Sequence, residues 1–271
     1  MDTSATIRRL TSSLTAMVGC LALSTAMLAS AHAEPSINAR QRSEKKVFTD
    51  SQIIDGFMKT AFGAEYHLAG RVDRIRKYQM PVRIFIDGSA RTDRQMQIGK
   101  VVGDIAMRVQ HLDIAMVDKR DDANTIITLV RDRDLQKTIT SFYGAEKAKE
   151  IQDSLDPQCL SGFRKNEDYE IQRSDVILTI DNGDFVFLDC AYEELLQSLG
   201  PINDTDSVPW TMFNDQVSMG FFGVYDQYIL NILYNPRIKA GMTVDEVRAL
   251  LPTILPDVRA WVAKVNHLPP R

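Results

Sequence analysis

The stretch from Cys190 to Asp204 constrains the fold more than any other part of the chain. At about 100° per residue, a helix here gathers apolar side chains on one face, namely Leu188, Tyr192, Leu195, Leu196 and Leu199. The opposite face carries Cys190, Glu193, Glu194 and Gln197. Gly200 and Pro201 end the helix, because proline cannot continue it. We expect a central helix from about residue 189 to 200, with its apolar face in the core and its polar face lining a concave surface.

The polar face has the spacing of a metal-protease helix, His-Glu-x-x-His-x-x-Gly-x-x-His. Glu193 stands at the first ligand position and Glu194 at the general-base position. Gln197 and Asn203 stand at the second and third ligand positions, where the pattern has histidines. A catalytic zinc ion usually has three imidazole or carboxylate ligands, and neutral amides are weak substitutes. The resemblance to zincins and metzincins therefore implies a degenerate helix, and we expect it to bind no zinc.

Two other chemistries remain open for this face. Calcium prefers carboxylate and amide oxygens, so Glu193, Gln197, Asn203 and Asp204 are an alternative calcium site. Glu193 and Glu194 are also candidates for an acid–base pair, since neighbouring carboxylates can separate their pKa values. Adjacent helical residues point about 100° apart, however, which favours a plain acidic patch. We expect no cofactor, with calcium as the exception to test.

Residues 1–33 are typical of a signal peptide. Arg8 and Arg9 precede a mainly small and apolar run, and the chain then reads Ala31-His32-Ala33 before Glu34. The pattern predicts export to the periplasm with cleavage after Ala33, and no transmembrane span in the mature chain. Met17-Val18-Gly19-Cys20 loosely resembles a lipobox. Anchoring through a lipid on Cys20 is therefore the alternative.

Charge and cysteine usage narrow the function further. The chain has 32 basic and 36 acidic residues, without a basic cluster interleaved with aromatics, which argues against a nucleic-acid partner. Beyond the predicted cleavage site only Cys159 and Cys190 remain. An exported chain with one pair of cysteines favours a disulfide over a nucleophilic Cys190.

The rest of the chain predicts a single α+β domain over residues 49–271, after a mobile leader at 34–48. Residues 71–77 form a basic stretch that we interpret as a solvated surface segment. Thr49 or Asp50 should cap one helix and Thr243 another. The expected strands are 81–88, 112–117 and 124–130, with a hairpin of 174–180 and 185–188 turned by Asp181-Asn182-Gly183. The expected helices are 53–62, 92–112, 135–155 with a break near Gly144, and 225–233 in a mostly helical part from 201 to 271.

Several short motifs together resemble domain-of-unknown-function family 2927, most strongly from Cys159 to Leu251. They are Cys190 with Tyr192-Glu-Glu-Leu-Leu-Gln-Ser-Leu-Gly200, Asn203-Asp204, Phe213-Asn214-Asp215, Tyr225-Asp226, Leu233-Tyr-Asn-Pro-Arg237 and Gly241-Met242. Its members are exported proteobacterial proteins, several described as lipoproteins, without an established activity. The family usually approaches the penultimate helix with a Thr-His-Asp-like sequence, whereas this chain reads Gly223-Val224-Tyr225-Asp226, so any chemistry of that histidine is missing here. Pro201 also replaces a more usual apolar residue.

Two functional classes follow from these patterns. The first is a catalytically silent, metallopeptidase-like binding or scaffold protein of the cell envelope, whose partner is an envelope protein or a peptide. The alternative is a hydrolase that uses the face of Glu193 and Glu194 with a metal other than zinc, or without a metal. The missing histidines favour the first class, a pseudoenzyme.

Overall fold

The computed structural model of the protein describes residues 36–63, 73–88, 92–155, 158–201 and 203–269. Residues Pro35–Arg271 form one compact unit. The predicted signal peptide and its cleavage site lie outside the described residues, as does Cys20.

The described residues contain one five-stranded mixed sheet. Its strands are β1 Val82–Asp87, β2 Ile114–Met116, β3 Thr125–Val130, β4 Cys159–Lys165 and β5 Ile171–Thr179. They lie in the order β2-β1-β3-β5-β4, where all neighbouring pairs are parallel except β4 with β5. The strands that we expected at 81–88, 112–117 and 124–130 are confirmed, and so is the α+β class.

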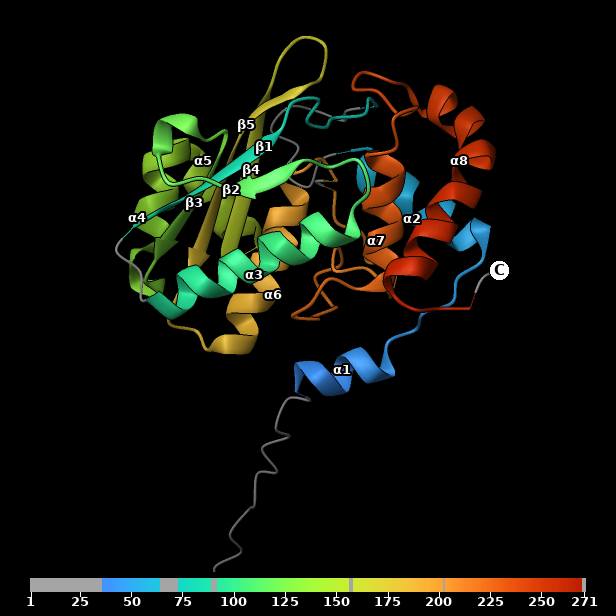
Figure 1. Cartoon of the computed structure of the whole chain (residues 1–271). Helices are drawn as coiled ribbons and strands as arrows, with labels where there is room; N and C mark the ends of the chain where they lie inside the picture. The colour runs from blue at the N-terminus through green and yellow to red at the C-terminus, as the bar shows by residue number, and fades with distance from the viewer. Residues whose placement is uncertain (1–35, 64–72, 89–91, 156–157, 202, 270–271) are drawn as a thin grey trace, which may run out of the picture. The chain divides into compact units, whose positions relative to one another are not determined.

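Helices cover both faces of the sheet (Figure 1). On one face lie α4 Asp132–Tyr143 and α5 Ala145–Leu155, which together confirm the broken helix predicted at 135–155. On the other face lie α3 Thr92–Arg108 and α6 Asp184–Gln197. Strand β5 serves both layers, because Ile177 packs with α4 and α5 while Val176 and Leu178 belong to the larger core.

The central helix α6 begins earlier than its sequence predicts. The hairpin of 174–180 and 185–188 was wrong, since β5 pairs with β4 instead and Asp184 already starts the helix. Gly183 takes a positive φ of 89° and is the residue before the helix, so the Asp-Asn-Gly turn leads from strand to helix. Four consecutive apolar residues follow at 185–188, and such a run fits a strand and a buried helix equally well.

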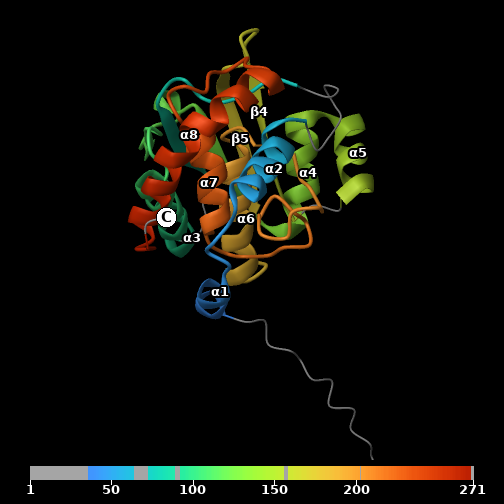
Figure 2. The ribbon, with the colours of Figure 1, turned by 90° about the vertical axis from the view of Figure 1, so that its right-hand side faces the viewer.

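Three helices form the part beyond the sheet, α2 Asp50–Ala61, α7 Val224–Leu233 and α8 Val244–Val265 (Figure 2). Every residue of α7 is buried, and α7 packs against both α2 and α8. Thr49 and Thr243 cap their helices through capping boxes, as the sequence predicts. Within the described ranges, no helix is both long and apolar enough to cross a membrane.

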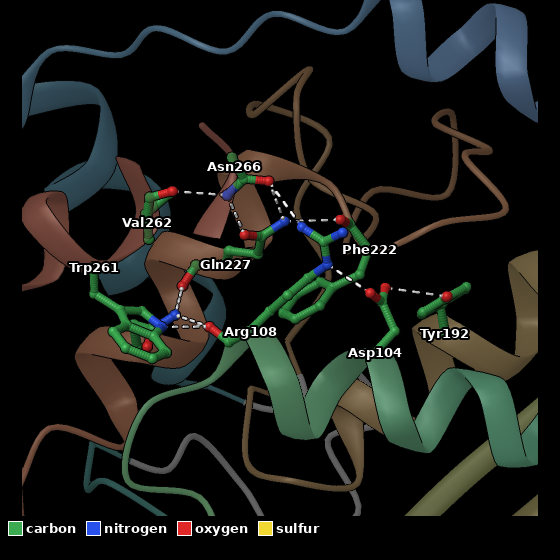
Figure 3. A network of polar contacts seen from close by, with 9 residues as sticks. Asp104, Arg108, Tyr192, Phe222, Gln227, Trp261, Val262 and Asn266 are labelled. Carbon is green, nitrogen blue, oxygen red and sulfur yellow. Dashed lines mark hydrogen bonds and ion pairs between the residues drawn. The ribbon is translucent and has the colours of Figure 1, made fainter. Parts of the chain in front are cut away.

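A polar network joins the back of α6 to this helical part (Figure 3). The Tyr192 hydroxyl donates to Asp104 on α3 at 3.2 Å, and Arg108 donates to the same carboxylate at 2.6 Å. Arg108 also donates to Asn266 at 2.8 Å, and Asn266 donates to Gln227 on α7 at 2.6 Å. The chain of bonds crosses α3, α6 and α7, and it fixes the orientation of α6 from its far side.

The basic stretch at 71–77 is not a solvated segment in its described part. Arg76 and Lys77 are 3 % and 5 % exposed, and both pay for burial through hydrogen bonds to backbone carbonyls. Burial lowers the pKa of Arg76 to about 10. A run of charged residues usually lies on the surface. Here the ends of α2 and α7 supply backbone carbonyls that accept the hydrogen bonds of Arg76 and Lys77, so both side chains can be buried.

The segment at 34–48, which its composition predicts to be mobile, is structured from residue 36. It contains a short helix, α1 Ile37–Ser43, and Arg40 donates to the Ser218 carbonyl at 2.7 Å. The Glu44 carboxylate accepts from the backbone N–H of Val224, at the start of α7. Polar side chains thus tie this segment to the domain, which a reading of composition alone overlooks.

Candidate functional site

The two faces of α6 are less different than the sequence suggests. Leu195, Leu196 and Leu199 are buried as predicted, whereas Leu188 and Tyr192 of the same face are only partly buried. On the polar face Glu194 and Gln197 are buried too, at 7 % and 4 % exposure. The polar face is enclosed because strand β4 packs against it. Cys190 on that face forms the predicted disulfide with Cys159 of β4, across a Cα–Cα distance of 5.9 Å, and this bond joins the edge of the sheet to the helix.

Three carboxylates converge at this end of α6. Oxygens of Glu193, Asp204 and Asp215 all lie within 4.8 Å of one another. Glu193 and Asp204 are partly buried and Asp215 is exposed. We call these three residues the carboxylate cluster. It draws on the helix and on both ends of the loop that follows, so it forms only in the folded chain.

Backbone hydrogen bonds close the loop that carries two of the three carboxylates. The N–H of Thr205 donates to the Phe213 carbonyl at 2.9 Å, which brings the two ends of the loop together. Buried Asn214 donates to the Val208 carbonyl at 3.0 Å. These bonds hold Asp204 and Asp215 near each other in the absence of any regular secondary structure.

Asp226 of α7 holds the same loop through hydrogen bonds. It is fully buried, and it accepts hydrogen bonds from the Thr211 hydroxyl at 2.5 Å and from the Met212 N–H at 3.2 Å. Burial raises its pKa to about 7, while the two hydrogen bonds lower it. Asp226 therefore positions the loop and takes no part in the carboxylate cluster.

The amides at the two pattern positions for imidazole ligands serve as hydrogen-bond donors to the protein. Gln197 donates to Asp204 at 2.9 Å, and it accepts weakly from Ser161 of β4 at 3.5 Å. Asn203 donates to the Lys59 carbonyl on α2 at 2.7 Å. Gln197 thus joins the loop to α6, and Asn203 joins it to α2. The charged side chains of the site are therefore carboxylates.

Glu194 lies behind the carboxylate cluster, against β4. It accepts hydrogen bonds from the side chain and backbone of Ser161. Its Oε2 atom is buried and has no hydrogen-bond partner among the described residues. Burial is the main cause that raises its pKa, and the charges of Asp204 and Asp215 add to the rise.

Glu193 shows the same effect more strongly. Burial raises its pKa well above the usual range, and the charges of Glu194, Asp204 and Asp189 raise it further. The carboxylates around Glu193 thus repel one another in a largely buried environment. They must be neutralised by shared protons or by a cation, because like charges this close cannot all stay ionised in isolation.

The candidate residues from the sequence therefore divide into three groups. Glu193 and Asp204 meet in the cluster, Glu194 lies next to it, and Gln197 and Asn203 support it. Sequence reasoning missed Asp215 and Ser161 as site residues. Asp215 belongs to the Phe213-Asn214-Asp215 motif, so a signal for it was present, whereas nothing in the sequence indicates that Ser161 meets Glu194.

Comparisons with known proteins add a family and no activity. A family model described as "Protein of unknown function (DUF2927)" matches residues 50–253. Neither a curated protein nor a solved structure matches the chain.

Proposed function

The chain belongs to the DUF2927 family of proteins of unknown function, and from that premise we propose a catalytically silent, metallopeptidase-like binding protein of the cell envelope. The proposal rests on the hydrogen bonds of two side-chain amides. Gln197 and Asn203, at the positions of imidazole ligands, donate hydrogen bonds to Asp204 and to the Lys59 carbonyl. A zinc peptidase needs imidazole or carboxylate ligands at those positions, and the remaining neutral amide oxygens are weak substitutes.

The order of elements supports the metallopeptidase-like part of the proposal. A strand, a long helix and further strands precede the central helix, and a mostly helical part follows it. This is the order that the resemblance to zincins implies. A variant with Glu193→His, Gln197→His and Asn203→His tests the geometry directly. We expect it to gain one zinc ion per chain, and a folded variant without zinc would contradict the zincin-like arrangement.

Peptidase assays test the proposal that the protein has no catalytic activity. Purified protein with added zinc, calcium or no metal should leave unfolded protein substrates intact. A Glu194→Gln variant is the matched control, because the change keeps the shape of the side chain and removes its acid. Hydrolysis by the natural chain that the variant loses would overturn the proposal.

That same outcome would favour the second candidate function, a hydrolase with a non-zinc metal or with none. The raised pKa of Glu194 is the observation in its favour, because a carboxyl that keeps its proton near neutral pH can act as a general acid. The hydrolase needs Glu194 to reach a substrate, however, and this side chain is only 7 % exposed.

The envelope location rests on the sequence of residues 1–33. We propose export with cleavage after Ala33, and an envelope protein or peptide as the partner. N-terminal sequencing of the exported protein should begin at Glu34. A diacylglycerol-modified Cys20 at the N-terminus would show that the chain is a lipoprotein instead.

A further inference from the structure

A hollow lies between the segment before α2 and the C-terminal half of α8. Figure 1 shows this segment, in blue, beside the last turns of α8, in red. Arg259 of α8 holds the segment in place, because its guanidinium donates to the Phe48 carbonyl at 2.9 Å and to the Asp50 carboxylate at 2.7 Å. The hollow has a volume of about 340 Å³, which is at the lower end of the range for small-ligand sites.

The walls of the hollow are mostly apolar. They include Val47, Phe48, Tyr228, Ala260, Ala263 and Leu268. The two alanines have short side chains, so α8 leaves room where it faces the segment. Val47 is 44 % exposed, and covering such an apolar side chain removes it from water, which is favourable. The hollow therefore suits the hydrocarbon part of a ligand.

The charged side chains of the walls are cationic, and no acidic residue in the described part of the chain lines the hollow. The cations are Lys46, Arg259 and Lys264. Two carboxylates of the same segment have other partners, since Asp50 accepts from Arg259 and Glu44 accepts from the first backbone N–H of α7. Asp50 thus balances the charge of Arg259. Lys46 and Lys264 are the cations that an anionic head group would meet, and lysine ammonium groups bind carboxylates through charge-assisted hydrogen bonds.

The polar groups of the walls select the kind of anion. A bound peptide needs acceptors for its backbone N–H groups as well as donors for its carbonyls. Among the lining side chains in the described ranges, the cations offer donors only, and the Tyr228 hydroxyl is the one acceptor. A carboxylate on a hydrocarbon chain needs no acceptor. The small volume also favours one chain over the two of a membrane phospholipid.

We propose that this hollow binds a single-chain fatty acid, with the hydrocarbon chain against Val47 and Ala260 and the carboxylate at Lys46 and Lys264. The site shares no residue with the carboxylate cluster. It goes beyond the proposed function, because it gives the protein a lipid ligand whether or not α6 is catalytically silent. A bound chain would also fasten the segment before α2 to α8, since it contacts both.

Calorimetric titration of the purified protein with sodium decanoate, below the concentration at which micelles form, tests the proposal. Decanoate should bind with one molecule per chain. Decyltrimethylammonium has the same hydrocarbon chain with a cationic head group, and it should bind at least about tenfold more weakly. This contrast between head groups needs no variant, so it is decisive even if a variant fails to fold.

Two variants locate the bound acid. Ala260→Phe should weaken decanoate binding about tenfold or more, because the ring fills the hollow. Ala106→Phe is its matched control, since Ala106 is an exposed alanine of α3 outside the hollow. The double change Lys46→Gln with Lys264→Gln should weaken binding about fivefold or more. Its control changes two exposed lysines elsewhere, Lys100→Gln with Lys149→Gln, and should leave the affinity as it is.

Each contrary result overturns the site. They are no decanoate binding up to about 1 mM, equal affinity for the two head groups, or an unchanged affinity in either folded test variant. Binding to phosphatidylglycerol vesicles without binding of decanoate would identify a membrane surface as the ligand and likewise refute the fatty acid. The substituted residues Lys46, Ala260 and Lys264 are exposed, so their variants should fold, and melting temperatures without ligand check this.

Discussion

The buried Lys77 should make the stability of the protein depend on pH, and this dependence can be measured. Its side chain is 5 % exposed, and Nζ donates to the carbonyls of Leu233 at 2.6 Å and Ile238 at 3.1 Å. Burial lowers its pKa to about 7, and the like charge of Lys239 contributes to the shift. We therefore expect Lys77 to contribute stability that grows as the pH rises above 7.

The sign and size follow from proton linkage. The unfolded chain holds the Lys77 proton up to a pKa of about 10.4, whereas the folded chain loses it near 7. Between these values the unfolded state binds about one more proton, so the free energy of unfolding rises by roughly 1.3 kcal/mol per pH unit. The gain is lost as the pH falls back through this window. Above about pH 10 buried tyrosines such as Tyr234, whose pKa burial raises, act in the opposite direction.

Urea unfolding at pH 7.5, 8.5 and 9.5 measures the effect, with Lys77→Met as the test variant. Over these two units the natural chain should gain about 2.5 kcal/mol more than the variant does. The slope is decisive, since the variant also loses two hydrogen bonds at every pH. Lys239→Met is the control, because this exposed lysine should leave most of the slope in place. Equal slopes for the natural chain and Lys77→Met would refute the reasoning.

Three further changes test the contacts that hold α6 in place. Reduction of the Cys159–Cys190 disulfide should lower the free energy of unfolding by about 3–4 kcal/mol, measured with urea at fixed pH, and an unchanged midpoint would contradict this. Leu195→Ala should lower it by about 2–5 kcal/mol, because the side chain is fully enclosed; a loss below about 1 kcal/mol would show that α6 is turned differently. Gly200→Ala should destabilise by about 2–5 kcal/mol, since Gly200 has a φ of 139° and its backbone is crowded, whereas Gly99→Ala in open space should be neutral or stabilising.

Local signals in the sequence were sufficient for much of the fold. Thr49 and Thr243 begin helices through capping boxes, which depend on residues three positions apart. The pairing of Cys159 with Cys190 follows from the count of cysteines beyond the predicted signal peptide. Such features need no knowledge of the tertiary structure, so a single sequence reveals them.

The predictions from sequence fail where contacts between distant parts of the chain determine the local structure. Residues 185–188 are apolar without a period, and their place after Gly183 is set by packing against the sheet. Lys77 is charged and still buried, because the end of α7 supplies acceptors for its protons. Asp215 joins Glu193 only when the loop closes through Thr205 and Phe213. The contacts of Lys77 and of residues 185–188 leave no mark on the residues nearby in sequence, whereas Asp215 has the signal of its Phe213-Asn214-Asp215 motif.

The silent site is the central claim, and a peptidase assay of the purified protein with zinc, with calcium and without metal measures it most directly. An unfolded protein substrate should stay intact under all three conditions. Hydrolysis by the natural chain that is lost in Glu194→Gln would contradict the account.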